Sequence, residues 1–410
     1  MKTKIGFILF TFLILHTTCS ACTTFLISGK YTADGKSILF KNRDTEQMQN
    51  ALVYFEDGRY KYIGLVNGNE DWDDMVWGGY NETGFAIINS VAYNINIGDT
   101  SKIIDREGYI MKLALQTCSS LQDFENLLNS LPKPMGSDAN FGVIDAYGGA
   151  AFYETGNYDF IKYDANDPIT APNGILVRTN HSFRADLTKG YGFCRYTTAM
   201  SALNQAALEK RIDPSYLFNH ISRNLYHSLT KTDLRSDIPE KRNVAEYKFF
   251  IDYIPRESTA SAIMIVGAKD KDHAKEAMVW TILGFPLTSV ALPAWISGGK
   301  SLPKAVSPDH QLKSPLCSMA LKFKEECFPL TYDKGLNYIN FSVLMNKENN
   351  GYMQLLQPIE EELFKKTEAL MQDLEKGRKT EKDIREFYVW IDEYLQDRYR
   401  EIFHVELFDE

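Results

Sequence analysis

The residues best suited to chemistry stand near the start of the chain, in the segment CSACTTFLISGKYTADGKSILFKNRD at positions 19–44. Two cysteines, Cys19 and Cys22, lie where an export leader is expected to end. Cleavage after Ala21 would make Cys22 the amino terminus, with a thiol and a primary amine on one residue. A free amino terminus titrates at about pH 7.7–8, so it is partly neutral at physiological pH and can take a proton from the neighbouring thiol. We therefore expect Cys22 to be a nucleophile that carries its own base.

The leader is predicted to be a signal peptide at residues 1–21. Lys2 and Lys4 precede an apolar stretch at 5–15, and small residues follow at positions 19 and 21, as in secretory signal peptides. The apolar stretch is too short to span a bilayer, so we expect no membrane span. The protein is expected to be secreted or periplasmic in a bacterial cell. Lipid attachment at Cys22 is the competing hypothesis, but a lipoprotein signal has an aliphatic residue where Cys19 stands.

Five cysteines remain after this cleavage, and an odd number leaves at least one thiol unpaired. Cys317 and Cys327 are ten residues apart in a segment that we interpret as a loop, and they could be bridged. Cys118 and Cys194 lie in apolar, helix-like surroundings that are typical of buried thiols. Cys22 then remains as the thiol that needs a functional explanation in an oxidising compartment.

The composition is that of an ordinary globular protein, with 410 residues, 44% hydrophobic residues and a net charge of -9. Basic residues form no run or patch, so nucleic acid is not an expected partner. The seven histidines show no metal-ligand spacing, and we expect neither a metal nor a cofactor. The sequence leaves homo-oligomerisation open.

Strand and turn patterns run from Cys22 to about residue 90, and helical spacing follows at 103–131. Strands are predicted again at 141–145, 150–155 and 175–179, a helical pattern covers 196–230, and strands return at 261–266 and 278–283. We predict an α+β fold with one catalytic domain at 22–350, built from helix, sheet, sheet and helix layers. A helical extension at 351–410 is expected to form two helices divided by Gly377.

The first two strands are expected to form a hairpin that brings Cys22 and Asp44 together. The strands are predicted at 23–28 and 37–43, and residue 33 is the middle of the turn between them. Antiparallel pairing about residue 33 would place Asp44 opposite Cys22. Asp44 could then accept hydrogen bonds from the amine and fix its direction. Lys41 and Arg43 flank the site and would favour the thiolate.

These residues resemble the amino-terminal-nucleophile (Ntn) cysteine hydrolases, in the branch that holds choloylglycine hydrolases, penicillin V acylases and beta-lactam acyltransferases. The similarity lies in CTTFLIS and DGKSILFKNRD, and it extends through NETGFAIINS (81–90), NFGVIDAYGGAAFYETG (140–156), RTNHSF (178–183) and GFCRYTTAMSAL (192–203). It covers most of residues 22–300. The resemblance implies a four-layer αββα sandwich with two stacked antiparallel sheets, followed here by C-terminal helices.

The resemblance also implies roles for single residues. Cys22 resembles the nucleophile, and Asp44 the acid that holds its amine. Asn89 resembles the residue whose side chain faces the developing oxyanion, and Asn180 the second active-site asparagine. Arg195 resembles the arginine that sits against the nucleophile and favours its ionised form. The loss of one oxyanion donor typically slows an enzyme by about a hundredfold to a thousandfold, so both asparagines are expected to matter.

The resemblance implies that the partner is a small-molecule amide substrate. The implied reaction is the hydrolysis of a linear amide through an acyl-enzyme, in which signal cleavage exposes the nucleophile. Lys41 stands where bile-salt hydrolases often have arginine, so bile-salt specificity does not follow from the resemblance. His181 is interpreted as a local hydrogen-bonding residue, because the terminal amine already supplies the base. The alternatives are an acyltransferase or dipeptidase of the same fold, and a non-catalytic lipid-anchored binding protein.

Overall fold

The computed structural model describes residues 21–68 and 74–408. The predicted signal peptide, apart from Ala21, lies outside the described residues, and so does Cys19. The expected cleavage point, between Ala21 and Cys22, therefore lies within the described residues.

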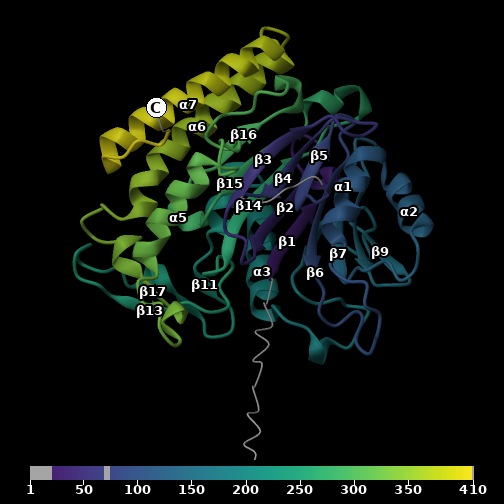
Figure 1. Cartoon of the computed structure of the whole chain (residues 1–410), viewed down its shortest axis with the longest axis horizontal. Coiled ribbons are helices and arrows are strands. Elements are labelled where there is room, and N and C mark those ends of the chain that lie inside the picture. Colours follow the sequence, from purple (N-terminus) through teal and green to yellow (C-terminus); the bar gives the residue numbers. More distant parts are fainter. Residues whose placement is uncertain (1–20, 69–73, 409–410) are drawn as a thin grey trace, which may run out of the picture.

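Two large antiparallel sheets form the centre of the molecule (Figure 1). Sheet A has six strands in the order β10-β1-β2-β14-β15-β16. Its strands are β10 (Ile175–Arg178), β1 (Cys22–Ile27), β2 (Ile38–Asp44), β14 (Thr259–Val266), β15 (Met278–Leu283) and β16 (Leu292–Ala294). Sheet A thus joins segments more than 200 positions apart, because β14 pairs with β2.

Sheet B has seven strands that follow one another in chain order, from β3 to β9. Its strands are β3 (Asn50–Phe55), β4 (Tyr62–Asn67), β5 (Gly78–Asn81), β6 (Ala86–Val91), β7 (Ala139–Ile144), β8 (Ala150–Thr155) and β9 (Phe160–Asp164). The predicted NETG turn at 81–84 joins β5 to β6. Two short strand pairs lie apart from the sheets: β11 (Tyr226–His227) with β12 (Thr232–Asp233), and β13 (Tyr247–Phe249) with β17 (Tyr338–Asn340).

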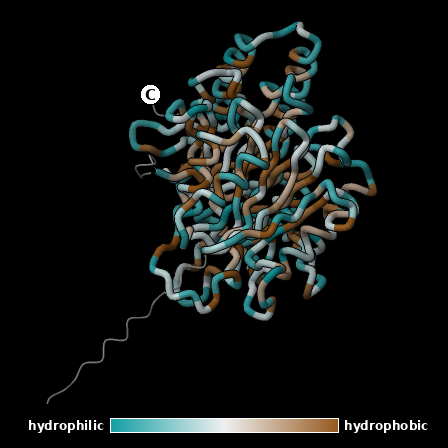
Figure 2. The backbone as a smooth tube through the Cα atoms, turned by 90° about the vertical axis from the view of Figure 1, so that its right-hand side faces the viewer, coloured by the Kyte–Doolittle hydropathy of each residue, from teal (hydrophilic) through white to brown (hydrophobic). Residues whose placement is uncertain are grey.

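Helices cover the outer face of each sheet. Helices α1 (Glu107–Thr117) and α2 (Leu121–Ser130) lie against sheet B, where α1 contacts β4, β5 and β6. On sheet A, α3 (Phe193–Leu208) contacts β10 and β1, and α5 (Pro315–Cys327) contacts β15. The expected order of helix, sheet, sheet and helix is confirmed. Figure 2 shows apolar segments gathered inside the molecule and hydrophilic segments at its outer turns.

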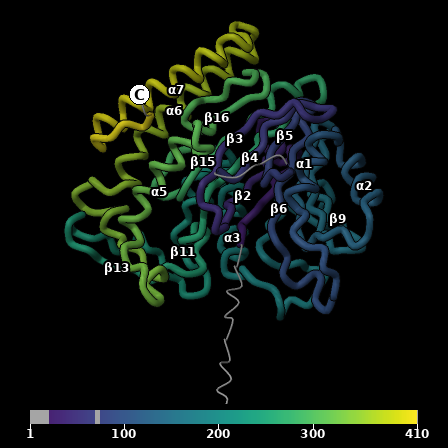
Figure 3. The backbone as a smooth tube through the Cα atoms, viewed as in Figure 1, coloured from purple at the N-terminus to yellow at the C-terminus, as the bar shows by residue number. Residues whose placement is uncertain are grey.

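The C-terminal helices are α6 (Tyr352–Glu375) and α7 (Glu381–Phe403), which lie side by side in Figure 3. Gly377 has φ of 64° in the turn between them, a conformation that glycine adopts without strain. Apolar residues of both helices belong to the same core as sheet A. Phe364, for example, packs on Trp280 of β15 with ring centroids 4.4 Å apart.

Two expectations about the later part of the chain are wrong. The segment with Cys317 and Cys327 is not a loop but helix α5, and both thiols are free. Ten residues of helix separate them by about 15 Å, which is far beyond the reach of a disulfide. The helical pattern at 196–230 also stops early, because α3 ends at Leu208 and the segment continues as α4 (Pro214–Leu217), a π-helical turn and β11.

Candidate active site

Cys22 is the first residue of β1, which lies between β10 and β2 in sheet A. Its side chain is nearly enclosed, with 4% of the residue exposed. Among the other described cysteines, Cys118, Cys317 and Cys327 are buried, and Cys194 is half-buried. Burial raises the pKa of Cys118 and of Cys317 to about 12, so these two thiols are protonated and inert at neutral pH.

The register of the first hairpin differs by one residue from the expected one. Cys22 pairs with Arg43 rather than Asp44. The connection from Ile27 to Ile38 contains an even number of residues, 28–37, so the hairpin has no single central residue. Because paired residues project from the same face of a sheet, Arg43 shares a face with Cys22 and Asp44 points to the other face.

Asp44 still reaches the site, through its backbone and from the opposite face. Its N–H donates to the carbonyl oxygen of Ala21 at 2.8 Å, directly before the expected cleavage point. Its carboxylate accepts a hydrogen bond from Oγ1 of Thr259 at 2.6 Å and lies 3.6 Å from Nη1 of Arg256. Burial raises the pKa of Asp44, and the nearby Arg256 and Arg195 offset part of this rise.

Asn180 and Arg195 hold the backbone of Cys22. The nitrogen of Cys22 donates to Oδ1 of Asn180 at 3.1 Å. Arg195 donates from Nη1 to the carbonyl oxygen of Cys22 at 2.7 Å and from Nη2 to Oδ1 of Asn180 at 2.7 Å. Nδ2 of Asn180 donates to the carbonyl of Val91 at 3.1 Å. Asn180 therefore orients the Cys22 nitrogen with its oxygen, while its amide nitrogen is already engaged.

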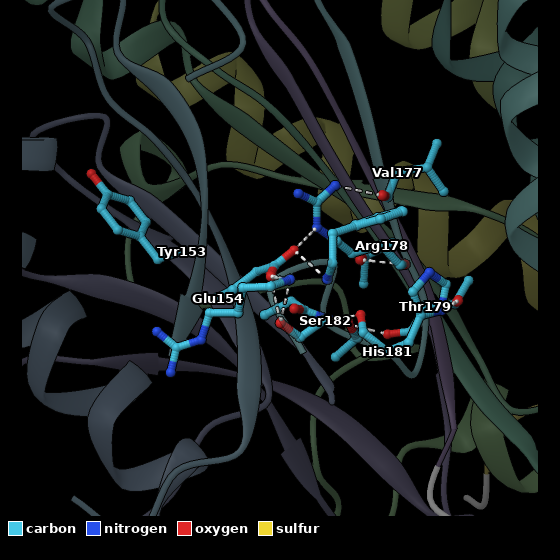
Figure 4. A network of polar contacts seen from close by, with 12 residues as sticks. Tyr153, Glu154, Val177, Arg178, Thr179, His181 and Ser182 are labelled. Atoms are coloured by element: carbon cyan, nitrogen blue, oxygen red, sulfur yellow. Dashed lines mark hydrogen bonds and ion pairs between the residues drawn. The ribbon is translucent and has the colours of Figure 1, made fainter. Parts of the chain in front are cut away.

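A buried ion pair across the two sheets fixes the segment that carries Asn180 (Figure 4). Nε of Arg178, on β10, donates to Oε1 of Glu154, on β8, at 2.9 Å. Glu154 also accepts hydrogen bonds from the hydroxyl of Ser182 and from the N–H of Phe183. With Arg178 before it and Ser182 after it both bound to one carboxylate, Asn180 has little freedom to move.

Asn89 and Lys41 meet between the two sheets. Lys41 is on β2 of sheet A, and its ammonium donates to Oδ1 of Asn89, on β6 of sheet B, at 2.7 Å. A second hydrogen bond of 2.9 Å runs from Lys41 to the carbonyl of Trp77. Burial lowers the pKa of Lys41 to about 8, although the charge of Cys22 opposes this shift. Lys41 and Asn89 thus form a polar contact beside the nucleophile.

The structure brings Cys22, Asp44, Asn180 and Arg195 together, and Asn89 joins them through Lys41. It adds Thr259 and Arg256, which sequence reasoning missed. Both lie more than 200 positions after Asp44 and carry no motif, so only the pairing of β14 with β2 reveals them. Arg43 shares the face of Cys22 and stacks over Trp77, with 4.7 Å from its guanidinium carbon to the ring centroid.

His181 is close to the site but directed into its own loop. Its Nδ1 lies 3.0 Å from the carbonyl oxygen of Tyr191 and 3.2 Å from Oγ1 of Thr179. Burial lowers the pKa of His181, so its imidazole is neutral at physiological pH. Within residues 21–68 and 74–408, no group of three or more His, Cys, Asp or Glu side chains is arranged to hold a metal ion, and no helix is long and apolar enough to cross a bilayer.

Comparison with known protein families gives one match. Residues 31–231, just under half of the chain, match the family of acyl-coenzyme A:6-aminopenicillanic acid acyl-transferases. The matched region contains Asp44, Asn89, Asn180 and Arg195 but begins after Cys22. None of the curated proteins compared with the chain matches it.

Several solved structures are similar to this chain. A Caenorhabditis elegans ortholog of N-acylethanolamine-hydrolyzing acid amidase has a TM-score of 0.41 and 16% identity, covering 63% of this chain and 99% of that chain. A mutant of conjugated bile acid hydrolase from Clostridium perfringens has a TM-score of 0.41 and 13% identity, covering 67% and 92%. Penicillin V acylase from Agrobacterium tumefaciens has a TM-score of 0.40 and 14% identity, covering 67% and 86%.

Proposed function

We propose that this chain is an exported hydrolase that cleaves linear N-acyl or non-peptide amides with Cys22 as its nucleophile. One observation carries the proposal: the backbone nitrogen and the side chain of Cys22 have different polar neighbours. Its nitrogen is held by Asn180 at 3.1 Å, and its side chain shares a face of sheet A with Lys41 and Arg43. After removal of the leader, that nitrogen is the terminal amine. A base and a nucleophile then occupy one residue.

The proposed reaction begins when the terminal amine takes the thiol proton and Sγ of Cys22 attacks the amide carbonyl carbon. The carbonyl electrons move onto oxygen, and Nδ2 of Asn89 donates to this oxyanion. The C–N bond then breaks, and the ammonium of Cys22 gives its proton to the leaving nitrogen. A water molecule, deprotonated by the same amine, attacks the thioester. The carboxylic acid leaves, and the thiol is restored.

Arg195 and Asp44 support the nucleophile from the other face of sheet A. Arg195 donates to the carbonyl oxygen of Cys22 at 2.7 Å, so its charge lies beside the reacting residue and favours the thiolate. The carboxylate of Asp44 is held by Thr259. Burial raises the pKa of Asp44, and the guanidinium groups of Arg256 and Arg195 beside it favour its ionised form.

The test is the turnover of a panel of N-acyl amides by the secreted protein and by Cys22→Ala. We expect turnover in the wild type and its loss in Cys22→Ala, with a mass spectrum showing that the mature chain starts at an unmodified Cys22. Cys194→Ala is the matched control, because Cys194 is free but contacts His227 and Ser228 instead of the site. Unchanged turnover in Cys22→Ala, or a lipid mass on Cys22, contradicts the proposal.

The family match favours acyl transfer as the second candidate function, because its description names an acyl-transferase. Hydrolysis and transfer share the acyl-enzyme and differ only in what attacks it. Hydroxylamine added during turnover separates them. An acyl-transferase should yield mainly the hydroxamate, and a hydrolase mainly the free acid.

A further inference from the structure

Lys41 is a cation in a fully enclosed place. Only 1% of the residue is exposed, and its ammonium makes two hydrogen bonds, to Oδ1 of Asn89 at 2.7 Å and to the carbonyl of Trp77 at 2.9 Å. Both acceptors lie in the part of the chain that forms sheet B, whereas Lys41 belongs to β2 of sheet A. The lysine therefore links the two sheets on the face of sheet A that also carries Cys22.

The ammonium decides which way the amide of Asn89 points. A lysine ammonium can donate hydrogen bonds but cannot accept them. The Asn89 atom that lies 2.7 Å from Lys41 must therefore be the oxygen, and Nδ2 must point away. Backbone pairing of Asn89 with Phe141 of β7 fixes the residue itself. Among the described residues none accepts a hydrogen bond from Nδ2, so this donor is available to a ligand oxygen.

This orientation depends on the charge of Lys41. Desolvation is the main force that lowers its pKa, and Arg43 lowers it further, while Cys22, Asp44 and Glu107 raise it; the result is about 8. Below that pH the ammonium has three donors and no lone pair. Above it the neutral amine has a lone pair that can accept from Nδ2 of Asn89, and the amide is no longer held in one direction.

We propose that Lys41 is a positioning residue that keeps Nδ2 of Asn89 turned toward the oxyanion of the reaction. The inference rests on the proposed function, because it assigns a role within that same site. It differs from a purely electrostatic effect on the thiol. An ammonium that only favours the thiolate would act on Cys22 whether or not Asn89 were present, whereas a positioning residue acts through Asn89.

A double-mutant cycle tests this difference. Lys41→Met, Asn89→Ala and the double variant are assayed with an N-acyl p-nitroanilide that the wild type hydrolyses. We expect kcat to fall by about a hundredfold in each single variant, with KM within about threefold, as for the loss of one oxyanion donor. The double variant should be no slower than Asn89→Ala. Single effects that multiply in the double variant overturn the proposal.

Two further readouts separate positioning from thiolate stabilisation. Alkylation of Cys22 by iodoacetamide needs the thiolate but no oxyanion donor, so Lys41→Met should slow alkylation much less than kcat. An equal fall in both overturns the proposal. The wild-type kcat should also decrease above about pH 8, the pKa of Lys41, and this decrease should be absent from Lys41→Met. Its persistence there overturns the proposal.

A control variant at another lysine and the activity of the wild type separate failure of this inference from failure of the proposed function. Lys36→Met removes another buried lysine of the same hairpin, one that pairs with Glu276 and Glu375 instead of the site, and it should leave kcat unchanged. If Lys41→Met fails to fold, Lys41→Gln replaces it. The glutamine amide can both donate and accept hydrogen bonds, so it no longer fixes the direction of the Asn89 amide. A wild type that turns over no amide contradicts the proposed function. An active wild type with an equally active Lys41 variant contradicts this inference alone.

Discussion

At the scale of the residue, the two site asparagines have opposite orientations. The resemblance treats both as candidates for oxyanion binding. In the structure Asn89 offers its amide nitrogen, because Lys41 holds its oxygen. Asn180 instead offers its oxygen to the nitrogen of Cys22, because its own amide nitrogen donates to Val91. One side-chain type thus fits two tasks, and the neighbouring donors and acceptors decide between them.

Asn180→Ala should therefore misplace the base rather than the oxyanion. We expect kcat to fall by about a hundredfold, as when a positioned acid or base is lost, with little change in KM, since Asn180 contacts the nucleophile residue. Steady-state kinetics measure this. Asn166→Ala is the control, because Asn166 accepts a hydrogen bond from Ser28 just beyond the other end of β1. Equal losses in the two variants would contradict the assigned role.

At the scale of the element, strand pairing carries the site residues into place. Strand β2 supplies Lys41 to one face and Asp44 to the other. Its two neighbours, β1 and β14, bring Cys22 and Thr259 to the same end of the sheet. A slip of one residue would exchange the faces of all these side chains. The ten-residue connection of the hairpin is closed by a hydrogen bond from Gly29 N–H to Oγ of Ser37, which stabilises the observed register.

The junction of α1 with β7 adds a pH dependence to stability. Glu107 is buried at the start of α1, where its Oε1 accepts the N–H of Asp138 at 2.9 Å, just before β7. Burial raises the pKa of Glu107 and of Asp138. A carboxyl whose pKa is higher in the folded state stabilises the fold below its ordinary pKa, and this contribution is lost as the pH rises through the folded-state value.

Glu107→Gln should therefore weaken this pH dependence. The wild-type free energy of unfolding is expected to fall by on the order of 2 kcal/mol between pH 5 and pH 8. The free energy of unfolding of the variant should fall clearly less over this range. Its amide can still accept the N–H of Asp138 but does not titrate. Chemical denaturation at the two pH values measures the difference. Glu368→Gln, at an exposed position of α6, should behave as the wild type; the same pH slope in Glu107→Gln would refute the assignment.

At the scale of the whole molecule, a buried ion pair joins helix α6 to Arg223, which follows the π-helical turn at 218–222. Arg223 binds both carboxylate oxygens of Glu360 on α6, at 2.6 and 2.8 Å. Glu360 also accepts the N–H of Ala291 at 2.6 Å. Tyr388 of α7 adds a hydrogen bond of 2.7 Å from the N–H of Trp295. Residues beyond position 350 thus complete the outer layer of sheet A.

Glu360→Ala should destabilise the protein by about 3–5 kcal/mol, because it leaves Arg223 buried and unpaired. Glu362→Ala is the matched control on the same helix. Glu362 pairs with the exposed Lys365 and Lys366, at 3.8 and 3.7 Å, and such pairs contribute about 1 kcal/mol or less. Denaturation curves of both variants compare the two losses. A loss of similar size in the two would show that the helices are not held by this ion pair.

Much of the fold could be predicted from the sequence, because its signals are local. Alternation of apolar residues predicts the strands of both sheets, and the turn at 81–84 lies where expected. The helix that contains Cys317 could not be recognised as readily. Ser314 caps it from outside, and Pro315 is its first residue, so a proline that resembles a loop signal in fact begins a helix.

The sequence by itself determined the chemical types at the site. A cysteine after a leader-like segment, an acid one hairpin away and two asparagines in separate motifs are all visible without coordinates. Only the tertiary structure decided how they face one another. Cys22 lies opposite Arg43, and Lys41 reaches Asn89 across the sheets, because register and stacking follow from contacts between distant segments. Such contacts depend on the packing of whole sheets, which no local pattern of residues specifies.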